Sequence, residues 1–206
     1  YINKSLDYNP ENYYAPFLKA FILYAKDGNT EKMKNRLIKE WKKDTTRLDI
    51  LQEVAKVWYF QEDYDSAFHY YEKFVRARET NGLDIYPQED IKIAFVYKKK
   101  GFEEQATNFF NAYSGYCEKD QSIYKSASMA VLYAYEGKND KAIEQLKIFA
   151  TQDNYQYWIL LFIEKDPVMK PLKNNPEFKL VVQKIKDRFW ENHDRLEQSL
   201  EEKGLI

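Results

Sequence analysis

Residues 51–74 constrain the fold of this chain more than any other stretch, because they carry two apolar stripes at helical spacing on either side of a polar turn at residues 61–63. Each stripe is too narrow to be stable in water alone and must pack against another helix. The small residues Ala55 and Ala67 stand where two helices would approach closely. The stretch therefore predicts a helix-turn-helix hairpin, and a chain built from such hairpins is a helical solenoid. The two stripes are Leu51, Val54, Ala55 and Trp58, and Tyr64, Ala67, Tyr71 and Phe74.

Similar hairpins are predicted at about 11–44, 45–80, 86–118 and 121–153. Their second helices begin with comparable residues at Met33, Ala67, Ala106 and Ala142, which are separated by 34, 39 and 36 positions. A period of about 34 residues is typical of one family of helix-turn-helix repeats. The extra residues fall in connections between hairpins, where insertions cost little.

Turn and capping residues mark the helix boundaries. A turn is expected at residues 27–29, with Thr30 as the N-cap of the next helix, and Thr45 or Thr46 is expected to cap the helix after that. Pro87 followed by acidic residues predicts another helix start, since proline and negative charge both suit a first turn.

The hairpins resemble the tetratricopeptide repeat family over residues 14 to about 150. This resemblance implies an all-α fold: a right-handed superhelix of four antiparallel helix pairs, closed by a long capping helix. The copy near Tyr14 departs from the family pattern, with Phe21 at a small position. The matching positions are Leu51, Val54, Ala55, Trp58, Ala67, Tyr71 and Phe74, then Ile93, Ala94, Tyr97, Gly101, Ala106, Phe110 and Tyr113, then Met129, Ala130, Tyr133, Gly137, Ala142, Leu146 and Phe149.

Residues 1–10 are interpreted as the tail of a preceding repeat, with Ile2 and Leu6 on one face and a stop at Asn9-Pro10. We expect the array to continue upstream. The chain begins at Tyr1 instead of Met, which fits either a removed signal segment or a piece cut from a longer protein.

Residues 154–206 differ from the repeats. An apolar helix is expected at 154–164, followed by a proline-rich break and a long helix that starts at Pro176 and is capped at Gly204. This segment resembles the closing region of tetratricopeptide arrays in bacterial signalling and transcriptional regulators, which carry DNA-binding or nucleotide-cyclase domains. We expect the final helix to cap the solenoid with an apolar stripe turned inward: Phe178, Val182, Ile185, Phe189, Leu196 and Leu200.

Charge and cysteine content limit the cellular locations and the classes of partner that we expect. The 32 basic and 33 acidic residues give a net charge of −1, so no general attraction to nucleic acid or to anionic lipid is expected. The longest apolar run, at 158–163, is too short to cross a bilayer. Cys117 is the single cysteine and predicts a cytoplasmic protein, although a disulfide-free periplasmic protein would look the same.

No motif for chemistry is present. His69, His193 and Cys117 have no zinc-site spacing, and neither a phosphate-binding glycine loop nor a nucleophile elbow occurs. We expect no enzyme activity, no cofactor and no metal. The basic run at 98–100 suits the negative end of a helix dipole, or alternatively an acidic peptide or a phosphate group.

The predicted binding site is the groove that first helices line in this repeat family. Side chains off the buried stripes would face it, and their aromatic and basic mixture suits an extended or helical peptide with acidic character. The lysine and asparagine set with which the family clamps a C-terminal carboxylate is missing. The predicted partner-binding residues are Gln52, Lys56, Tyr59, Lys92, Phe95, Lys99, Tyr124, Ser128 and Tyr135, with Leu18, Lys19, Ile22 and Val131 nearby.

The sequence thus predicts a non-catalytic scaffold that binds a protein or peptide partner, as the sensory or assembly region of a larger bacterial regulator. Two alternatives remain open. One is a homodimerisation module that uses the exposed side of the last helix around Trp190. The other is an accessory domain of an enzyme encoded upstream.

Overall fold

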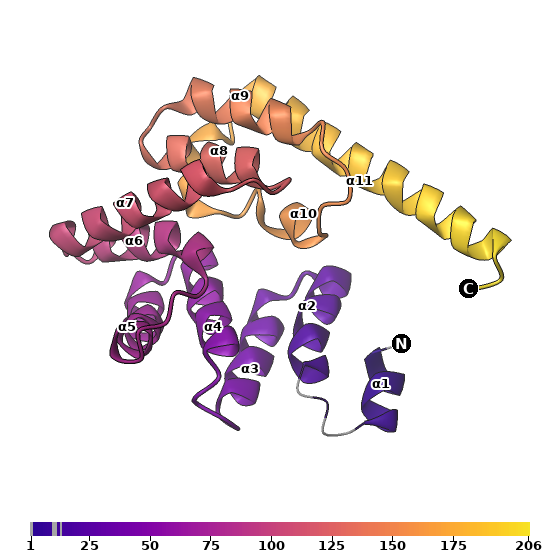
Figure 1. The fold of residues 1–206 in the computed structure, drawn as a ribbon, viewed down its shortest axis with the longest axis horizontal. Helices are drawn as coiled ribbons and strands as arrows, with labels where there is room; N and C mark the ends of the chain where they lie inside the picture. Colours follow the sequence, from indigo (N-terminus) through magenta and orange to yellow (C-terminus); the bar gives the residue numbers. More distant parts are fainter. Residues whose placement is uncertain (1, 10–11, 13) are drawn as a thin grey trace. The chain divides into compact units, whose positions relative to one another are not determined.

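The computed structural model describes residues 2–9, 12 and 14–206, and these residues form helices and loops without any strand (Figure 1). The prediction of an all-α fold is confirmed. The predicted segment start at Tyr1, the stop at Pro10 and the helix start near Tyr13 lie outside the described residues. The α-helices are α1 (Ile2–Tyr8), α2 (Ala15–Asp27), α3 (Thr30–Trp41), α4 (Leu48–Phe60), α5 (Tyr64–Thr80), α6 (Asp90–Lys99), α7 (Glu103–Lys119), α8 (Lys125–Tyr135), α9 (Asn139–Phe149), α10 (Trp158–Phe162) and α11 (Pro176–Glu202). Two 3₁₀ turns are η1 (Pro87–Glu89) and η2 (Pro167–Leu172).

The chain forms two compact units, Tyr1–Ala106 and Thr107–Ile206, whose boundary falls inside α7. In the first unit, each helix from α2 to α6 packs against the next one along the chain. In the second unit, α8 packs against α9 and η2, and α11 packs against α9. Contacts between neighbours in sequence are what a chain of hairpins requires.

The α4–α5 turn lies where it is predicted. Glu62 adopts a left-handed conformation with a φ of 59°, which reverses the chain. Asp63 then caps α5, because its carboxylate accepts a hydrogen bond from the Ser66 backbone N–H at 3.0 Å. The first hairpin turns by the same means, with Gly28 left-handed at a φ of 64°.

Two predicted caps are wrong by one or two residues. Asn29, not Thr30, caps α3, and its side chain accepts from the Lys32 N–H at 2.9 Å. Neither Thr45 nor Thr46 caps α4. The carboxylate of Asp44 binds the Thr46 N–H at 3.0 Å and holds these residues in a turn, so that α4 starts only after Arg47.

Small residues lie at the helix contacts of the first unit, as expected. Ala20, Ala55, Ala67 and Ala94 are fully buried. Phe74 is also fully buried, at a position where the repeat pattern has a small residue. Bulky aromatic side chains therefore fill part of the space between these helices.

The predicted helix at 154–164 is wrong. Only α10, five residues long, is helical there, and none of its residues is buried. Asn154 is left-handed, with a φ of 61°, and turns Tyr155 into the core. The Tyr155 ring lies 4.9 Å from that of Phe149, and its hydroxyl donates to the Ile185 carbonyl. Insertion of this tyrosine into the core replaces the helix that local apolarity predicts.

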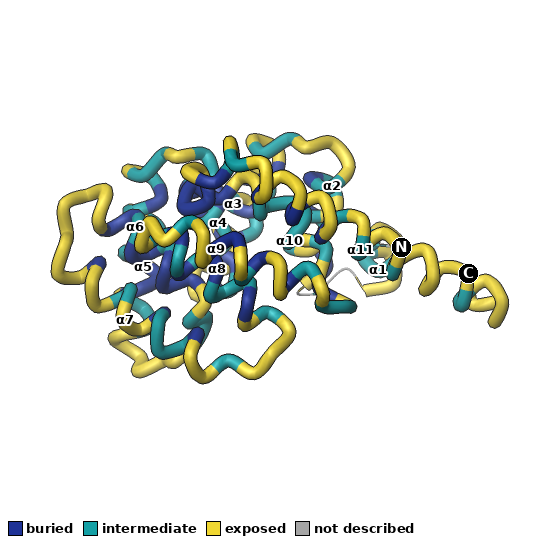
Figure 2. Tube along the Cα trace, turned by 90° about the horizontal axis from the view of Figure 1, so that it is seen from above, coloured by how far each residue is buried: buried dark blue, intermediate teal, exposed yellow. Residues whose placement is uncertain are grey.

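Helix α11 starts at Pro176, as predicted, but only its first part closes the core. Its buried residues are Phe178, Val181, Val182 and Ile185. Leu196 is 60% exposed. Figure 2 shows the remainder of the helix as exposed or intermediate. The expected inward-facing stripe therefore ends near the middle of the helix.

We predict that Ala67→Leu destabilises the protein by about 2 kcal/mol, because the extra methyl groups have no space at a fully buried helix contact. Chemical denaturation followed by circular dichroism measures the change. Ala112→Leu makes the same substitution at an exposed position of α7 and is expected to have an effect below about 0.5 kcal/mol. Equal effects of the two substitutions would contradict the close approach of the helices at Ala67.

Candidate functional site

The predicted groove residues of the first unit form two rows that meet each other. Helical spacing places Gln52, Lys56 and Tyr59 along one side of α4. The same spacing aligns Lys92 and Phe95 on α6. In the structure the two helices are in contact, and both rows reach the boundary between them.

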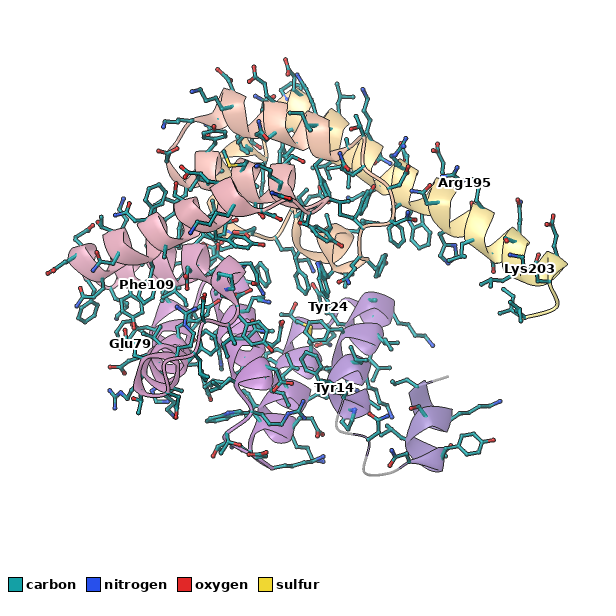
Figure 3. All side chains as sticks on the ribbon, in the orientation of Figure 1. Tyr14, Tyr24, Glu79, Phe109, Arg195 and Lys203 are labelled. Atoms are coloured by element: carbon teal, nitrogen blue, oxygen red, sulfur yellow. The ribbon has the colours of Figure 1, made fainter. Side chains whose placement is uncertain are left out.

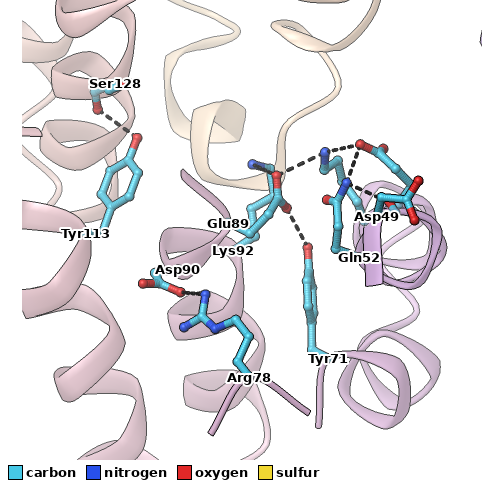
Figure 4. Close-up of polar contacts among 11 residues, drawn as sticks. Asp49, Gln52, Tyr71, Arg78, Glu89, Asp90, Lys92, Tyr113 and Ser128 are labelled. Carbon is cyan, nitrogen blue, oxygen red and sulfur yellow. Dashed lines mark hydrogen bonds and ion pairs between the residues drawn. The ribbon is translucent and has the colours of Figure 1, made fainter. Parts of the chain in front are cut away.

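A buried ionic cluster joins the rows (Figure 4). The Lys56 Nζ lies 2.8 Å from a Glu53 carboxylate oxygen and 3.0 Å from one of Glu89. The Lys92 Nζ lies 3.5 Å from the same oxygen of Glu89. The Tyr71 hydroxyl donates to the other Glu89 oxygen at 3.2 Å. We call Glu53, Lys56, Tyr71, Glu89 and Lys92 the Glu89 cluster.

Burial and pairing act against each other within the Glu89 cluster. Burial by itself raises the pKa of Glu89, but the ammonium groups of Lys56 and Lys92 lower it below the ordinary value. Burial by itself also lowers the pKa of Lys56, yet Glu53 and Glu89 raise it above the ordinary value. Glu89 and Lys56 are therefore both ionised at neutral pH, and the charge of each depends on its partners.

Two further ion pairs lie in the same unit. The Arg78 guanidinium donates to Asp90 at 2.8 Å and to the Ile85 carbonyl at 3.3 Å, so it ties α5 to the loop before η1. Arg47 contacts both carboxylate oxygens of Asp49, at 3.2 and 2.6 Å. Beside the latter pair is an open cleft of about 490 Å³, lined by Tyr14, Thr46, Arg47, Leu48, Asp49, Ile85 and Tyr86.

An aromatic group continues the contact between α4 and α6. The Phe95 ring lies 5.8 Å from that of Tyr59 and 5.7 Å from that of Tyr64. The Lys99 ammonium is 5.3 Å from the centre of the Phe95 ring, a cation–π distance. Lys99 is exposed, whereas Tyr59 is fully buried.

These positions correct the predicted groove. Gln52 and Tyr59 are 4% and 0% exposed and offer no surface to a partner. Lys56 and Lys92 pair with Glu89, and Lys56 also pairs with Glu53, so the two positive charges are already balanced inside the chain. The side of α4 that helical phase assigns to a groove is covered because α6 packs there. Lys99 stays accessible, and Phe95 is partly so.

The three predicted residues near α8 also make internal contacts. The Tyr124 hydroxyl accepts the Gln156 backbone N–H at 2.9 Å. The Ser128 carbonyl accepts the Tyr113 hydroxyl at 3.1 Å. The Tyr135 ring stacks on that of Phe110, with ring centres 5.2 Å apart. Each side chain is partly buried, so these residues contribute to the packing of the second unit.

An exposed apolar row lies on α2 instead. Tyr14, Leu18 and Ile22 are spaced by four residues and are 61%, 47% and 50% exposed. Ala20 and Tyr24, on the other side of the helix, are buried. Figure 3 marks Tyr14 and Tyr24 at opposite ends of α2. Leu18 and Ile22 were expected to face a partner, and the structure leaves them accessible.

The histidines lie exposed on two helices, α5 and α11. In the described part of the chain, His193, Asp194 and Glu197 form one group whose donor atoms lie within 4.8 Å of one another. All three are exposed on a single turn of α11, an arrangement that is common without a bound ion. His69 is exposed and lies against the Tyr70 ring.

Burial raises the pKa of the Cys117 thiol to about 11. We therefore predict that a disulfide exchange reagent at pH 8 labels Cys117 only after unfolding. In the native state the raised pKa keeps the thiol protonated at this pH, and its burial keeps the reagent away. Absorbance of the released thiol, with and without urea, measures the labelling. Rapid labelling of the native protein would show that Cys117 is accessible.

We predict that Lys56→Met costs about 3 kcal/mol of unfolding free energy at pH 7, because it leaves the buried Glu89 carboxylate with weaker pairing. The pKa of Glu89 then rises, so protonation relieves the penalty and the cost shrinks as the pH falls from 7 to 4. Urea titration at several pH values measures this dependence.

Lys43→Met removes an exposed pair with Glu40 and serves as the control, with an expected cost below about 1 kcal/mol. If Lys56→Met and Lys43→Met behaved alike, the Glu89 cluster would not be a buried ionic contact.

Sequence reasoning misses Glu53 and Glu89 as partners of the predicted lysines, and Tyr71 as a partner of Glu89. In the sequence, Glu89 is one of the acidic residues after Pro87 that indicate a helix start. A lysine whose helical phase places it at a contact between two helices could have been a signal, because a charge that is buried there needs a residue of opposite charge beside it.

The helices within the described ranges include none that is long and apolar enough to cross a membrane. No family model and no curated protein sequence matches the chain.

Proposed function

We propose that this chain is a non-catalytic protein–protein interaction scaffold made of tetratricopeptide-like repeats in a right-handed superhelix. Support comes from the consecutive packing of α2 to α6 and from the buried alanines at their contacts. Comparable small residues recur in the second unit at Ala130 and Ala142, both fully buried. Such arrays present one helix per repeat to a ligand.

The main observation behind this proposal is the exposed apolar row on α2, formed by Tyr14, Leu18 and Ile22, which we call the α2 row. Leu18 and Ile22 are about half exposed, although a folded chain gains free energy by burying such side chains. Exposed apolar side chains that are contiguous on one helix face commonly mark an interaction site. The four-residue spacing matches the anchor positions with which helices and grooves recognise each other.

The charge on α2 points to an acidic partner. Lys26 follows Ile22 by four residues and continues the row, and Lys19 adjoins Leu18. We propose that the ligand is an amphipathic peptide segment whose apolar side chains contact Leu18 and Ile22 and whose acids contact Lys19 and Lys26.

The biological setting is proposed from the resemblance of the C-terminal segment alone. We propose that the chain is the sensory or assembly region of a larger cytoplasmic bacterial regulator. Homodimerisation through α11 is the second candidate, favoured by Trp190, which is 45% exposed beyond the last buried residue of that helix.

We predict that photo-crosslinking from position 18 captures a partner in cells and that Ile22→Asp reduces the yield about tenfold, because a buried charge opposes the contact. Gel mobility and mass spectrometry identify the adduct. Ile148 is 49% exposed in the second unit, so Ile148→Asp is the matched control and leaves the yield unchanged. Equal losses from both substitutions, or no adduct from position 18, would reject α2 as the binding surface.

A further inference from the structure

The distal half of α11, residues 189–202, carries a second accessible apolar surface, and only its first residues contact the rest of the second unit. Its last buried residue is Ile185, yet the helix continues to Glu202. Trp190 and Leu196 on this half are 45% and 60% exposed. A helix that continues from an anchored first half needs no new nucleation, so it persists without packing along its full length.

Phe189, Leu196 and Leu200 lie on one side of the distal half, with His193 between them, since their spacings of four, three and four residues define a single helix face. Trp190 lies about 100° round the helix from Phe189, on the side of Glu197 and Glu201. Glu197 and Glu201, also four residues apart, border this face next to the leucines. The distal half is thus an apolar stripe with one acidic edge.

Contacts to the rest of the second unit hold only the start of this half. Arg188 lies 3.0 Å from Asp153, and the Asn192 amide donates to the same carboxylate at 2.8 Å. The Tyr157 ring lies 5.3 Å from Phe189 and 5.9 Å from Trp190. The helix from His193 onward extends past this clamp, and Figure 3 labels Arg195 on this part of the helix and Lys203 just after its end.

Charge selects among the classes of partner. Residues 189–203 contain five acidic and two basic side chains. An acidic helix is repelled by anionic lipid and by nucleic acid, whereas helices that lie on membranes carry lysine and arginine. Pairing with the same helix of a second copy would bring two acidic segments together, which weakens it.

We propose that the distal half of α11 binds a basic amphipathic helix of a partner protein. The partner's apolar face covers Leu196 and Leu200, and its lysines or arginines pair with Glu197 and Glu201. This is the helix-pairing mode in which apolar side chains supply affinity and flanking charges select the partner. The surface is separate from the α2 row, so the two proposals are tested by different substitutions.

The test uses the full chain and a fluorescein-labelled peptide of leucine and lysine, about five turns long, with its lysines on one face. Fluorescence anisotropy is expected to show saturable binding that weakens as salt is raised. Leu196→Ser combined with Leu200→Ser is expected to weaken binding about tenfold or more, since both side chains leave the contact. Gln198→Ser, on the exposed opposite side, leaves binding unchanged.

Two comparison peptides separate the contribution of the apolar face to binding from the contribution of charge. A peptide with glutamate in place of lysine is expected not to bind, and a scrambled lysine peptide without an apolar face is expected to bind at least about tenfold more weakly. Glu197→Gln with Glu201→Gln is expected to reduce the salt dependence. Circular dichroism and the thermal midpoint check that each variant is folded.

Binding that is unaffected by the leucine substitutions, or equal binding of the scrambled peptide, would overturn the proposal. Sedimentation of the chain without peptide tests the second copy as occupant. A dimer that the leucine substitutions dissociate would assign the stripe to self-association and also overturn the basic helix.

Discussion

The carboxylate of Glu89 is the contact on which the first unit depends, because three successive helices reach it. Lys56 comes from α4, Tyr71 from α5 and Lys92 from α6. Removing such a charge from water is costly, and the cost is offset only while these donors stay in place. The Glu89 cluster therefore ties α4, α5 and α6 together at one point, and each donor must be in place for the buried carboxylate to stay paired.

This internal use of charge leaves few of the predicted groove residues of the first unit accessible. In an open solenoid the lysines and aromatics of first helices remain available to a ligand. Here Lys56, Lys92 and Tyr59 are committed to contacts within the unit, and α8 contributes Tyr135 to a ring stack with Phe110. Accessible apolar side chains lie elsewhere, for example Leu18 and Ile22 on α2, Ile148 on α9, Trp158 on α10 and Leu196 on α11. The binding surfaces proposed above lie on α2 in the first unit and on the distal half of α11 in the second.

The sequence predicts correctly those features of the fold that depend on residues close together in the chain. The turn before Asp63, the proline that opens α11 and the buried Ala67 all follow from short-range rules of capping and spacing. It does not predict features that depend on contacts between residues far apart in the chain. Tyr155 is not helical because its ring packs against Phe149 and its hydroxyl donates to the Ile185 carbonyl. Neither partner can be recognised from the residues next to Tyr155 in the sequence. Helical phase places Gln52 and Tyr59 on the correct side of α4, but it does not reveal that α6 covers that side.

The contacts at Asp153 divide α11 into an anchored part and a projecting part. A helix rises about 1.5 Å per residue, so the segment from Asn192 to Glu202 extends about 15 Å. Asp153, which accepts a hydrogen bond from Asn192, lies in the loop after α9 that also carries Tyr155 into the core. A force on the last turn of the helix would therefore act, through this hydrogen bond, on the loop that places Tyr155.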